Sequence, residues 1–422
     1  LMAKWSDEIE GHRLRPESLM MSYGYRPEWS EGSAVSPIFQ TSTFEFPNAA
    51  AGKRAFQLAY GLDDAEPGEE SPLIYSRINN PGLEIAEARI AVWDDAEEGL
   101  LFESGMAAIT TTLWSYLRPG DVLLASAPLY GGTNHFIESV LPEFGVEVVR
   151  FDLTTSFDEM KAKVDAASGR LGMVLAETPA NPTNDLVDMA LCVRLAAEYS
   201  TADRKVPVAV DNTFLGPVFQ SPHEHGVDIV LYSATKYLGG HSDLIAGAAT
   251  GSKEVLGPIK MMRTMLGTMT SPWVGWLLER SLKTLRLRMD KQAENARVVA
   301  DYLRDHDKVE RVNWLGHIDE QHPNWDLYQR QCKGPGAMVA VELVGGELEA
   351  YRFLDSLRLI KLAVSLGAVE SLAEHPATMT HSAASQEEKA AFGIKDNLVR
   401  VSVGIEFADD ILLDLGQALK AV

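Results

Sequence analysis

Between about residue 80 and residue 255, short apolar runs alternate with stretches of helical spacing. The apolar runs are unbroken, which is typical of strands that are buried on both faces. The predicted strands are 121–125, 146–151, 172–176, 206–210, 228–232 and 244–250, and the predicted helices include 105–116, 157–167 and 187–199. Strand–helix alternation of this kind predicts an α/β fold whose central sheet is mainly parallel and covered by helices on both faces.

We expect three parts along the chain. Residues 1–75 have little periodicity and an acidic loop at 63–70, but they also contain many aromatic residues. So long an irregular segment is unusual inside a compact domain, which predicts an N-terminal arm that packs against a neighbouring subunit. Residues 76–275 form the main domain. Residues 276–422 form a smaller C-terminal α/β domain with a long amphipathic helix, predicted strands at 337–343, 359–364 and 398–403, and a final helix near 409–419.

Charge and cysteine usage limit the partners and the compartment. The chain has 38 basic and 60 acidic residues and a formal net charge of −22, so nucleic acid and anionic membranes are not expected as partners. No apolar stretch reaches the roughly 18 residues that a membrane span needs, and the first residues lack the apolar core of a signal peptide. Cys192 and Cys332 are the two cysteines, which suits a reducing compartment. We therefore expect a cytoplasmic protein.

Lys236 follows the predicted strand 228–232 and lies between Ser233 and Thr235. In a parallel sheet, ligands bind outside the carboxyl ends of the strands. A lysine in a partly desolvated pocket loses its proton readily and becomes a nucleophilic amine, and the two hydroxyls add donors for an anion. On this motif alone, a surface lysine in an ordinary turn explains the residues equally well.

Asp211 follows the preceding strand, 206–210. A carboxylate at the end of so apolar a strand is costly to bury unless it meets a cation, and a protonated pyridine nitrogen is such a cation. The spacing 236 − 211 = 25 fits one connection to the next strand, so Asp211 and Lys236 could face one pocket. The alternative for Asp211 is a helix cap.

Two weaker signals accompany this pair. Gly105 and Met106 open a predicted helix, whose N–H groups suit a phosphate. Tyr130 follows another strand, where its ring could stack on a flat cofactor and its hydroxyl could move protons, although it could also fill a loop pocket. Neither nucleotide-binding glycine motif occurs, and His223-Glu224-His225 has adjacent side chains that point apart, so no metal site is predicted.

Four segments carry a family resemblance. They are Tyr-Ser-Arg-Ile-Asn-Asn-Pro at 75–81, Glu-Thr-Pro-Ala-Asn-Pro-Thr at 177–183, Ser-Ala-Thr-Lys-Tyr-Leu-Gly-Gly-His-Ser-Asp at 233–243 and Leu-Val-Arg-Val-Ser-Val-Gly at 398–404. Together they resemble the Cys/Met-metabolism enzymes that use pyridoxal phosphate, the cystathionine γ-synthase-like family. The resemblance runs from about residue 18 to the end. It implies fold type I, which is the aspartate-aminotransferase-like fold, with pyridoxal 5′-phosphate as cofactor.

The resemblance also implies a role for each matching residue. Lys236 would bind the cofactor covalently and then move protons, Asp211 would pair with the pyridine nitrogen, and Tyr130 would stack on the ring. The residues implied to bind the cofactor's phosphate are Gly105, Met106, Ser233 and Thr235, with Tyr75 and Arg77 reaching the phosphate of the neighbouring subunit's cofactor. The residues implied to bind the substrate carboxylate are Arg400, Asn181 and Ser365. A homo-oligomer, as a dimer of dimers, is implied as well.

The reaction expected from the resemblance is γ-elimination from methionine or a related thioether. Val364 stands where many cystathionine enzymes have a glutamate, and an apolar lining favours a methionine-like side chain. Gly132, however, stands where methionine γ-lyases typically have cysteine. It resembles the cystathionine enzymes and the homoserine-ester sulfhydrylases, so γ-replacement on an O-acetyl- or O-succinyl-homoserine is the alternative. A catalytically silent homologue acting as a scaffold is the alternative outside enzymes.

Overall fold

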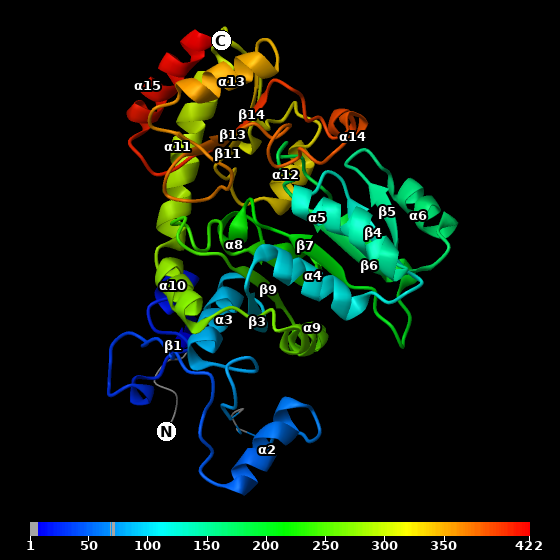
Figure 1. The fold of residues 1–422 in the computed structure, drawn as a ribbon, viewed down its shortest axis with the longest axis vertical. Helices are drawn as coiled ribbons and strands as arrows, with labels where there is room; N and C mark the ends of the chain where they lie inside the picture. Colours follow the sequence, from blue (N-terminus) through cyan, green and yellow to red (C-terminus); the bar gives the residue numbers. More distant parts are fainter. Residues whose placement is uncertain (1–6, 68, 70–71) are drawn as a thin grey trace.

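The computed structural model describes residues 7–67, 69 and 72–422, and its two larger sheets are linked by a long helix (Figure 1). A small third sheet near the N-terminus pairs β1 (Glu8–Ile9) with β2 (His12–Arg13). The larger sheet has seven strands in the order β3-β9-β8-β7-β6-β4-β5, and all run parallel except β9, which is antiparallel to both of its neighbours. The strands are β3 (Glu98–Phe102), β4 (Asp121–Ser126), β5 (Glu147–Phe151), β6 (Arg170–Glu177), β7 (Val208–Asp211), β8 (Ile229–Ser233) and β9 (Gly247–Gly251). The predicted mainly parallel sheet is therefore present.

Both faces of the larger sheet are buried, which explains its unbroken apolar strands. Along β4, Val122 and Leu124 belong to one hydrophobic core, whereas Leu123 and Ala125 belong to another on the opposite face. The first core includes residues of α3 (Pro81–Trp93), α6 (Phe157–Ala166), α7 (Met189–Tyr199) and α10 (Pro272–Leu282), and the second includes residues of α4 (Gly105–Tyr116) and α9 (Lys253–Leu266). Helices therefore cover the sheet on both sides.

The smaller sheet has five strands in the order β10-β11-β14-β13-β12. They are β10 (Val309–Asn313), β11 (Met338–Leu343), β12 (Lys361–Leu362), β13 (Leu372–Glu374) and β14 (Leu398–Ser402). A third hydrophobic core joins this sheet to α11 (Leu285–Arg304), α13 (Glu347–Ser356) and α15 (Ala408–Ala418). The register places Glu374 of β13 directly beside Arg400 of β14.

Helix α11 runs from the larger sheet to the smaller one (Figure 1). Near its beginning, Arg288 Nη1 donates to the carbonyl of Tyr237 at 2.7 Å, in the loop that follows β8. Farther along, Gln292 Nε2 donates to the carbonyl of Ala368 at 2.7 Å, on the smaller-domain side. Buried polar groups of this kind are strongly constrained, because leaving one unpaired is costly. One helix therefore fixes the loops of both sheets.

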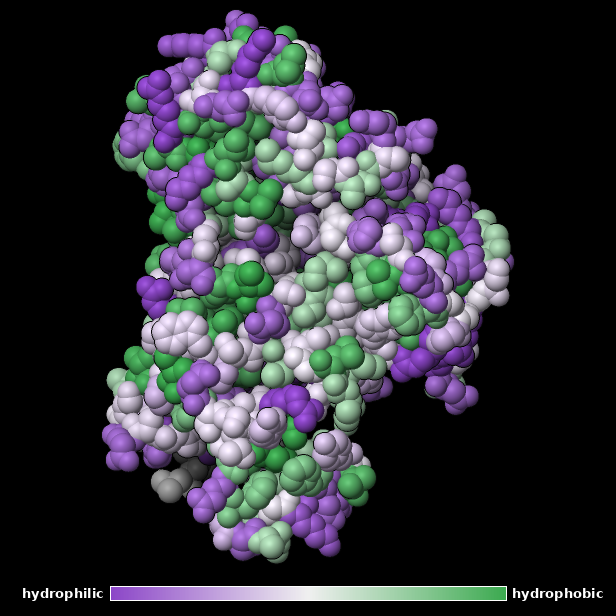
Figure 2. All heavy atoms as spheres, viewed as in Figure 1, coloured by the Kyte–Doolittle hydropathy of each residue, from purple (hydrophilic) through white to green (hydrophobic). Residues whose placement is uncertain are grey.

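The N-terminal arm contains a helix that the sequence analysis did not predict. Helix α2 (Ala49–Ala59) extends away from the two sheets, and its N-cap Asn48 accepts a hydrogen bond from the amide of Ala51 (Figure 1). Its first residues, Ala-Ala-Ala-Gly at 49–52, are small and carry little apolar–polar contrast, so the amphipathic pattern is confined to residues 53–59. Phe56 and Leu62 are exposed, and Figure 2 shows hydrophobic residues on this projecting segment. The predicted irregular arm is thus wrong for residues 49–59.

The acidic loop is tied back to this helix by one arginine. Arg54 Nη2 donates to Glu69 at 2.6 Å, and its Nη1 donates to Asp63 at 2.7 Å. These exposed or half-exposed pairs contribute little stability individually, but they give the loop a definite path beside α2.

Several sequence predictions need correction. The predicted strand 359–364 pairs only at Lys361–Leu362, because the chain leaves the sheet and turns toward the cavity described below. Strand β9 occupies 247–251 rather than 244–250. Helix α3 was missed because ten of its thirteen residues are buried, which removes the polar face that reveals a helix in a sequence. The three-part division at residues 75 and 275 stays a prediction.

Candidate active site

A cavity of about 530 Å³ lies at the carboxyl ends of β4, β6, β7 and β8, beneath residues of the smaller domain. This is the edge at which parallel sheets bind ligands. Ten of the twelve predicted site residues line it: Gly105, Met106, Tyr130, Asn181, Asp211, Ser233, Thr235, Lys236, Ser365 and Arg400. The sheet topology therefore brings residues together that are nearly 300 positions apart in the sequence (400 − 105 = 295).

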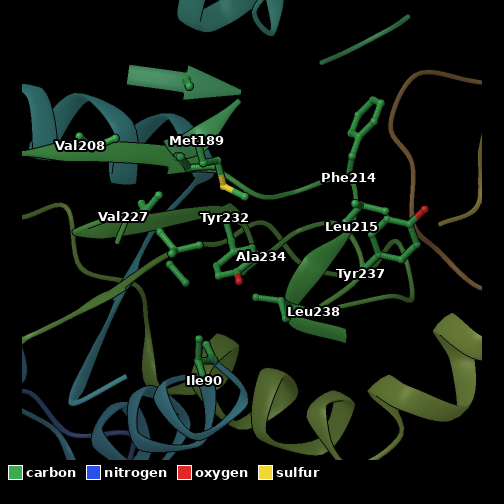
Figure 3. Close-up of a cluster of buried hydrophobic side chains, with 14 of the residues drawn as sticks. Ile90, Met189, Val208, Phe214, Leu215, Val227, Tyr232, Ala234, Tyr237 and Leu238 are labelled. Atoms are coloured by element: carbon green, nitrogen blue, oxygen red, sulfur yellow. The ribbon is translucent and has the colours of Figure 1, made fainter. Parts of the chain in front are cut away.

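Lys236 presents its amine to this cavity. Its Nζ donates to Ser365 Oγ at 2.8 Å. Burial, with the positive charge of Arg400 as the next cause, lowers the pKa of Lys236 to about 8. Tyr237 and Leu238, which follow directly, are buried in the core (Figure 3). The backbone of the lysine is thus anchored, while its amine is poised to become neutral.

Asp211 lies at the end of β7 and is buried. The amide and the hydroxyl of Thr213 both donate to its Oδ1, at 3.0 and 2.6 Å. Glu177 is its register partner on β6, and burial raises the pKa of both carboxyl groups. Two adjacent buried carboxyls resist simultaneous ionisation unless a cation is near. The arrangement therefore favours a positively charged ligand group beside Asp211.

The beginning of α4 meets the end of β8. A Cβ on Gly105 would lie 2.9 Å from the Cβ of Ser233, so only glycine allows this approach. The first amides of a helix have no intrahelical acceptor and can bind an anion. The hydroxyl of Thr235 bonds the backbone of Ala246 in both directions, accepting from its amide at 3.0 Å and donating to its carbonyl at 3.2 Å. Ser233 and the helix amides are thus better placed than the Thr235 hydroxyl for a phosphate.

The smaller sheet supplies Arg400 to the opposite side of the cavity. Its Nη1 donates to Asn181 Oδ1 at 2.7 Å, and its Nη2 donates to the carbonyl of Ser365 at 2.8 Å. Ser365 has a φ of +94°, which is rare for a residue with a side chain. This backbone conformation accompanies two contacts at once, the carbonyl with Arg400 and the hydroxyl with Lys236. Strain of this kind concentrates at functional sites.

Tyr130 lies at the rim, after β4. Its amide donates to Glu177 Oε2 at 2.8 Å, and the amide of Asn181 donates to Glu177 Oε1 at 2.7 Å. The Tyr130 ring lies against Gly132, since a Cβ at Gly132 would be 2.7 Å from the ring's Cε1. Glu177 therefore fixes the backbone on two sides of the cavity, and Gly132 leaves room for the ring.

Three contributing residues received no role from the sequence. Glu177 ends an apolar strand, the same signal that identified Asp211, and could have been found in that way. Thr213 follows Asp211 by two residues, a spacing at which hydroxyl and carboxylate groups commonly bond. Glu374 pairs with Arg400 at 2.8 Å across β13 and β14, and no local sequence signal indicates that pairing.

Tyr75 and Arg77 do not line the cavity of their own chain. Tyr75 is exposed, and Arg77 Nη1 donates to the carbonyl of Thr264 at 2.6 Å. Their predicted contact with a neighbouring subunit stays a prediction.

The described residues contain no group of three or more potential metal ligands. His223 instead bonds the carbonyl of Val227 and the hydroxyl of Thr250. Within the same described residues, no helix is both long enough and apolar enough to span a bilayer.

These residues fit pyridoxal phosphate. An amine with a lowered pKa, a buried carboxylate that favours a cation and an anion-binding helix terminus surround one cavity on an α/β scaffold. The fold and the site thus define a pyridoxal-phosphate enzyme of fold type I.

Comparison with known proteins identifies the family. Residues 17–420 match the model of the Cys/Met metabolism PLP-dependent enzymes. L-methionine gamma-lyase from Pseudomonas putida is 41% identical over 418 residues, which cover 99% of each chain. Cystathionine gamma-lyase from Sus scrofa is 37% identical over 400 residues, which cover 94% of this chain and 92% of that protein. The crystal structure of cystathionine gamma synthase from Xanthomonas oryzae pv. oryzae in complex with cystathionine superimposes with a TM-score of 0.85 and 33% identity, covering 96% of this chain and 98% of that one. The chain belongs to the Cys/Met metabolism PLP-dependent enzyme family.

Proposed function

We propose that this enzyme catalyses γ-elimination from methionine or a related thioether, which with water gives 2-oxobutanoate, ammonia and a thiol. One observation carries the proposal. Once the residues assigned to cofactor and carboxylate are set aside, the smaller-domain side of the cavity and its rim are largely apolar, with Ile245, Val364, Leu366 and Met379. A thioether methyl suits this lining, whereas the charged distal end of cystathionine would meet no charged partner among these four residues. The methionine γ-lyases among the relatives support the same choice.

The cofactor would be held by the residues that face it. Lys236 would bind it covalently, Asp211 would pair with its pyridine nitrogen, Tyr130 would stack on its ring, and Gly105, Met106, Ser233 and Thr235 would surround its phosphate. When bound, pyridoxal phosphate supplies an electron sink for the carbanion that forms when the substrate loses a proton.

The chain's own groups would then bind the substrate and move its protons. Arg400, with Asn181 and Ser365 beside it, holds the α-carboxylate, because a guanidinium matches the two oxygens of a carboxylate. The neutral Lys236 amine would remove the proton from Cα, which its lowered pKa allows near neutral pH. A proton then leaves Cβ as well, and its electron pair forms the Cβ–Cγ double bond as the sulfur departs. The Tyr130 hydroxyl donates a proton to the departing sulfur at Cγ.

Gly132 favours the alternative reaction, γ-replacement on an acylated homoserine. A cysteine at this position would place its Cβ against the Tyr130 ring, so the arrangement seen here needs glycine. A cystathionine γ-synthase is also among the similar structures. The two reactions share the residues above and differ in whether a thiol leaves or enters at Cγ.

A substrate comparison separates these reactions. We expect kcat/KM to be highest for methionine or a close thioether and lower for cystathionine. Each well-placed apolar contact should contribute roughly 1–3 kcal/mol to the difference in transition-state binding free energy. The measurement is 2-oxobutanoate and thiol release from each compound, alongside O-acetyl- and O-succinyl-homoserine offered with a thiol. If no thioether yields 2-oxobutanoate while the esters and thiol give product, γ-replacement is the activity.

We also propose a cytoplasmic homo-oligomer, a dimer of dimers, in which Tyr75 and Arg77 complete a neighbouring cavity. Three observations support the oligomer. These are the projecting α2 with its exposed apolar residues, the exposure of Tyr75, and the absence of both residues from the cavity lining of their own chain. The two free cysteines, one buried and one half-buried, support the compartment.

Complementation tests the shared site. Lys236→Ala and Arg77→Ala should each be nearly inactive. After mixing, unfolding and reassembly, a hybrid dimer should regain one intact cavity, which has Lys236 from one subunit and Arg77 from the other. The measurements are kcat of the mixture and the mass by analytical ultracentrifugation. A fully active monomer, or a mixture no more active than its parts, contradicts the shared site.

A further inference from the structure

A buried ion pair lies behind the carboxylate side of the cavity. Arg400 Nη2 and Glu374 Oε1 are 2.8 Å apart, and the two side chains are only 2% and 1% exposed. Because the residues are direct partners in the register of β13 and β14, the sheet itself fixes this pairing. Arg400 lines the cavity, whereas Glu374 is not among its lining residues. The carboxylate therefore contacts the guanidinium without itself lining the cavity.

The pair leaves bonding capacity unused. Glu374 Oε1 also accepts a hydrogen bond from Thr380 Oγ1 at 3.1 Å, yet Glu374 Oε2 and Arg400 Nε are buried with no hydrogen-bond partner among the described residues. Unpaired buried polar atoms are costly, so a pair built for stability alone would be more completely bonded. The two charged groups are therefore joined by one contact, between Arg400 Nη2 and Glu374 Oε1, and not by a two-point fork.

An arginine without a counter-charge in this cavity would attract carboxylates strongly, because charge interactions are less screened away from water. Substrate and 2-oxobutanoate both carry a carboxylate, so such an arginine would hold the product as well as the substrate. Binding that is equally strong throughout the reaction does not raise turnover. A fixed negative charge behind the arginine reduces its attraction for both.

We propose that Glu374 is a positioning residue that holds Arg400 at the cavity wall and offsets part of its charge, thereby limiting the affinity for the α-carboxylate of substrate and product. The proposal rests on the proposed carboxylate-binding role of Arg400. It makes two opposite predictions for two conservative variants. Glu374→Gln keeps an oxygen for Arg400 and Thr380 but removes the charge, whereas Glu374→Asp keeps the charge but withdraws it from Arg400.

The test uses the holoenzyme and two small amines. Glycine carries the α-carboxylate but no γ substituent, and methylamine lacks the carboxylate. Their dissociation constants follow from titrating the cofactor's absorbance. In Glu374→Gln, glycine should bind roughly tenfold more tightly, as the loss of one nearby opposing charge predicts. In Glu374→Asp, glycine should bind severalfold more weakly because Arg400 is less well held. The dissociation constant of methylamine should change by less than twofold in both variants.

The outcomes separate this inference from the role of Arg400. If Arg400→Lys leaves the preference for glycine over methylamine unchanged, Arg400 does not bind the carboxylate. Suppose instead that Arg400→Lys removes that preference. If Glu374→Gln and Glu374→Asp then both weaken the binding of glycine, or change the affinities for both amines equally, Glu374 has only a structural role. Should Glu374→Gln fail to fold, Glu374→Asp still contradicts the proposal if it leaves the glycine affinity unchanged or changes the affinities for both amines equally.

Discussion

Replacing Lys236 with alanine is expected to lower kcat by roughly 10²–10⁴-fold while the protein still folds. In the described part of the chain, Lys236 is the one lysine that lines the cavity, so no second amine is placed to take over its proton transfers. The neighbours Tyr237 and Leu238 keep the backbone anchored in the core. The measurements are steady-state kcat, the thermal unfolding midpoint, and the position of the label after borohydride reduction of the wild-type holoenzyme.

The pH dependence of cofactor attachment gives an independent check. Only the neutral amine attacks an aldehyde, so attachment of pyridoxal phosphate to the apoprotein should accelerate with rising pH and level off above about 8, the pKa of Lys236. An ordinary lysine would continue to accelerate toward about 10.4. Lys253→Ala is the control for Lys236→Ala, because the Lys253 side chain is 70% exposed and pairs with Glu97 at the surface, away from the cavity. Full turnover in Lys236→Ala, or labelling of another lysine, would contradict the assignment.

Replacing Asp211 with asparagine is expected to lower kcat/KM by roughly 10²–10³-fold. Asparagine keeps the Oδ1 that accepts both hydrogen bonds from Thr213, so the loop after β7 should hold its shape. The change removes the negative charge that would keep a proton on the pyridine nitrogen. The dissociation constant of the cofactor should rise at the same time, which spectroscopic titration of the apoprotein measures.

Asp94→Asn is a matched control for this variant. Asp94 is also a buried aspartate, and it accepts hydrogen bonds from Tyr232 and Thr250, but it does not line the cavity. Its replacement should lower the thermal midpoint and leave kcat close to the wild-type value. Equal losses of kcat in the two variants would indicate that Asp211 acts only through the fold.

The larger sheet and the Asp211–Lys236 pair were predictable because both residues come at or shortly after the ends of apolar strands. Asp211 ends β7 and Lys236 follows the end of β8, and parallel strands bring their carboxyl ends to one edge. Arg400 could be placed only through the family resemblance, since it lies on a different sheet. The local pattern around it says nothing about which loop it faces.

The remaining features depend on contacts that a sequence does not display. Strand β13 has three residues, too few for a visible alternation, so neither the strand nor the Glu374–Arg400 pair could be foreseen. Helix α3 is buried nearly all round and lacks a polar face. Strand 359–364 was overpredicted because its apolar residues serve different places: Ile360 packs in the third core, Leu362 pairs in the sheet and Val364 lines the cavity.

Helix α11 has a consequence for the handedness of the substrate. By bonding the carbonyl of Tyr237 on one side and that of Ala368 on the other, it fixes the spacing between the amine of Lys236 and the loop that contains Ser365. The carboxylate, the α-hydrogen and the side chain of a bound amino acid then meet three different walls whose relative positions are set. In the mirror-image amino acid, only two of these three groups can face their matching wall at the same time. We therefore expect enantiomer selection to depend on the helix that joins the two halves of the enzyme, even though no residue of that helix lines the cavity.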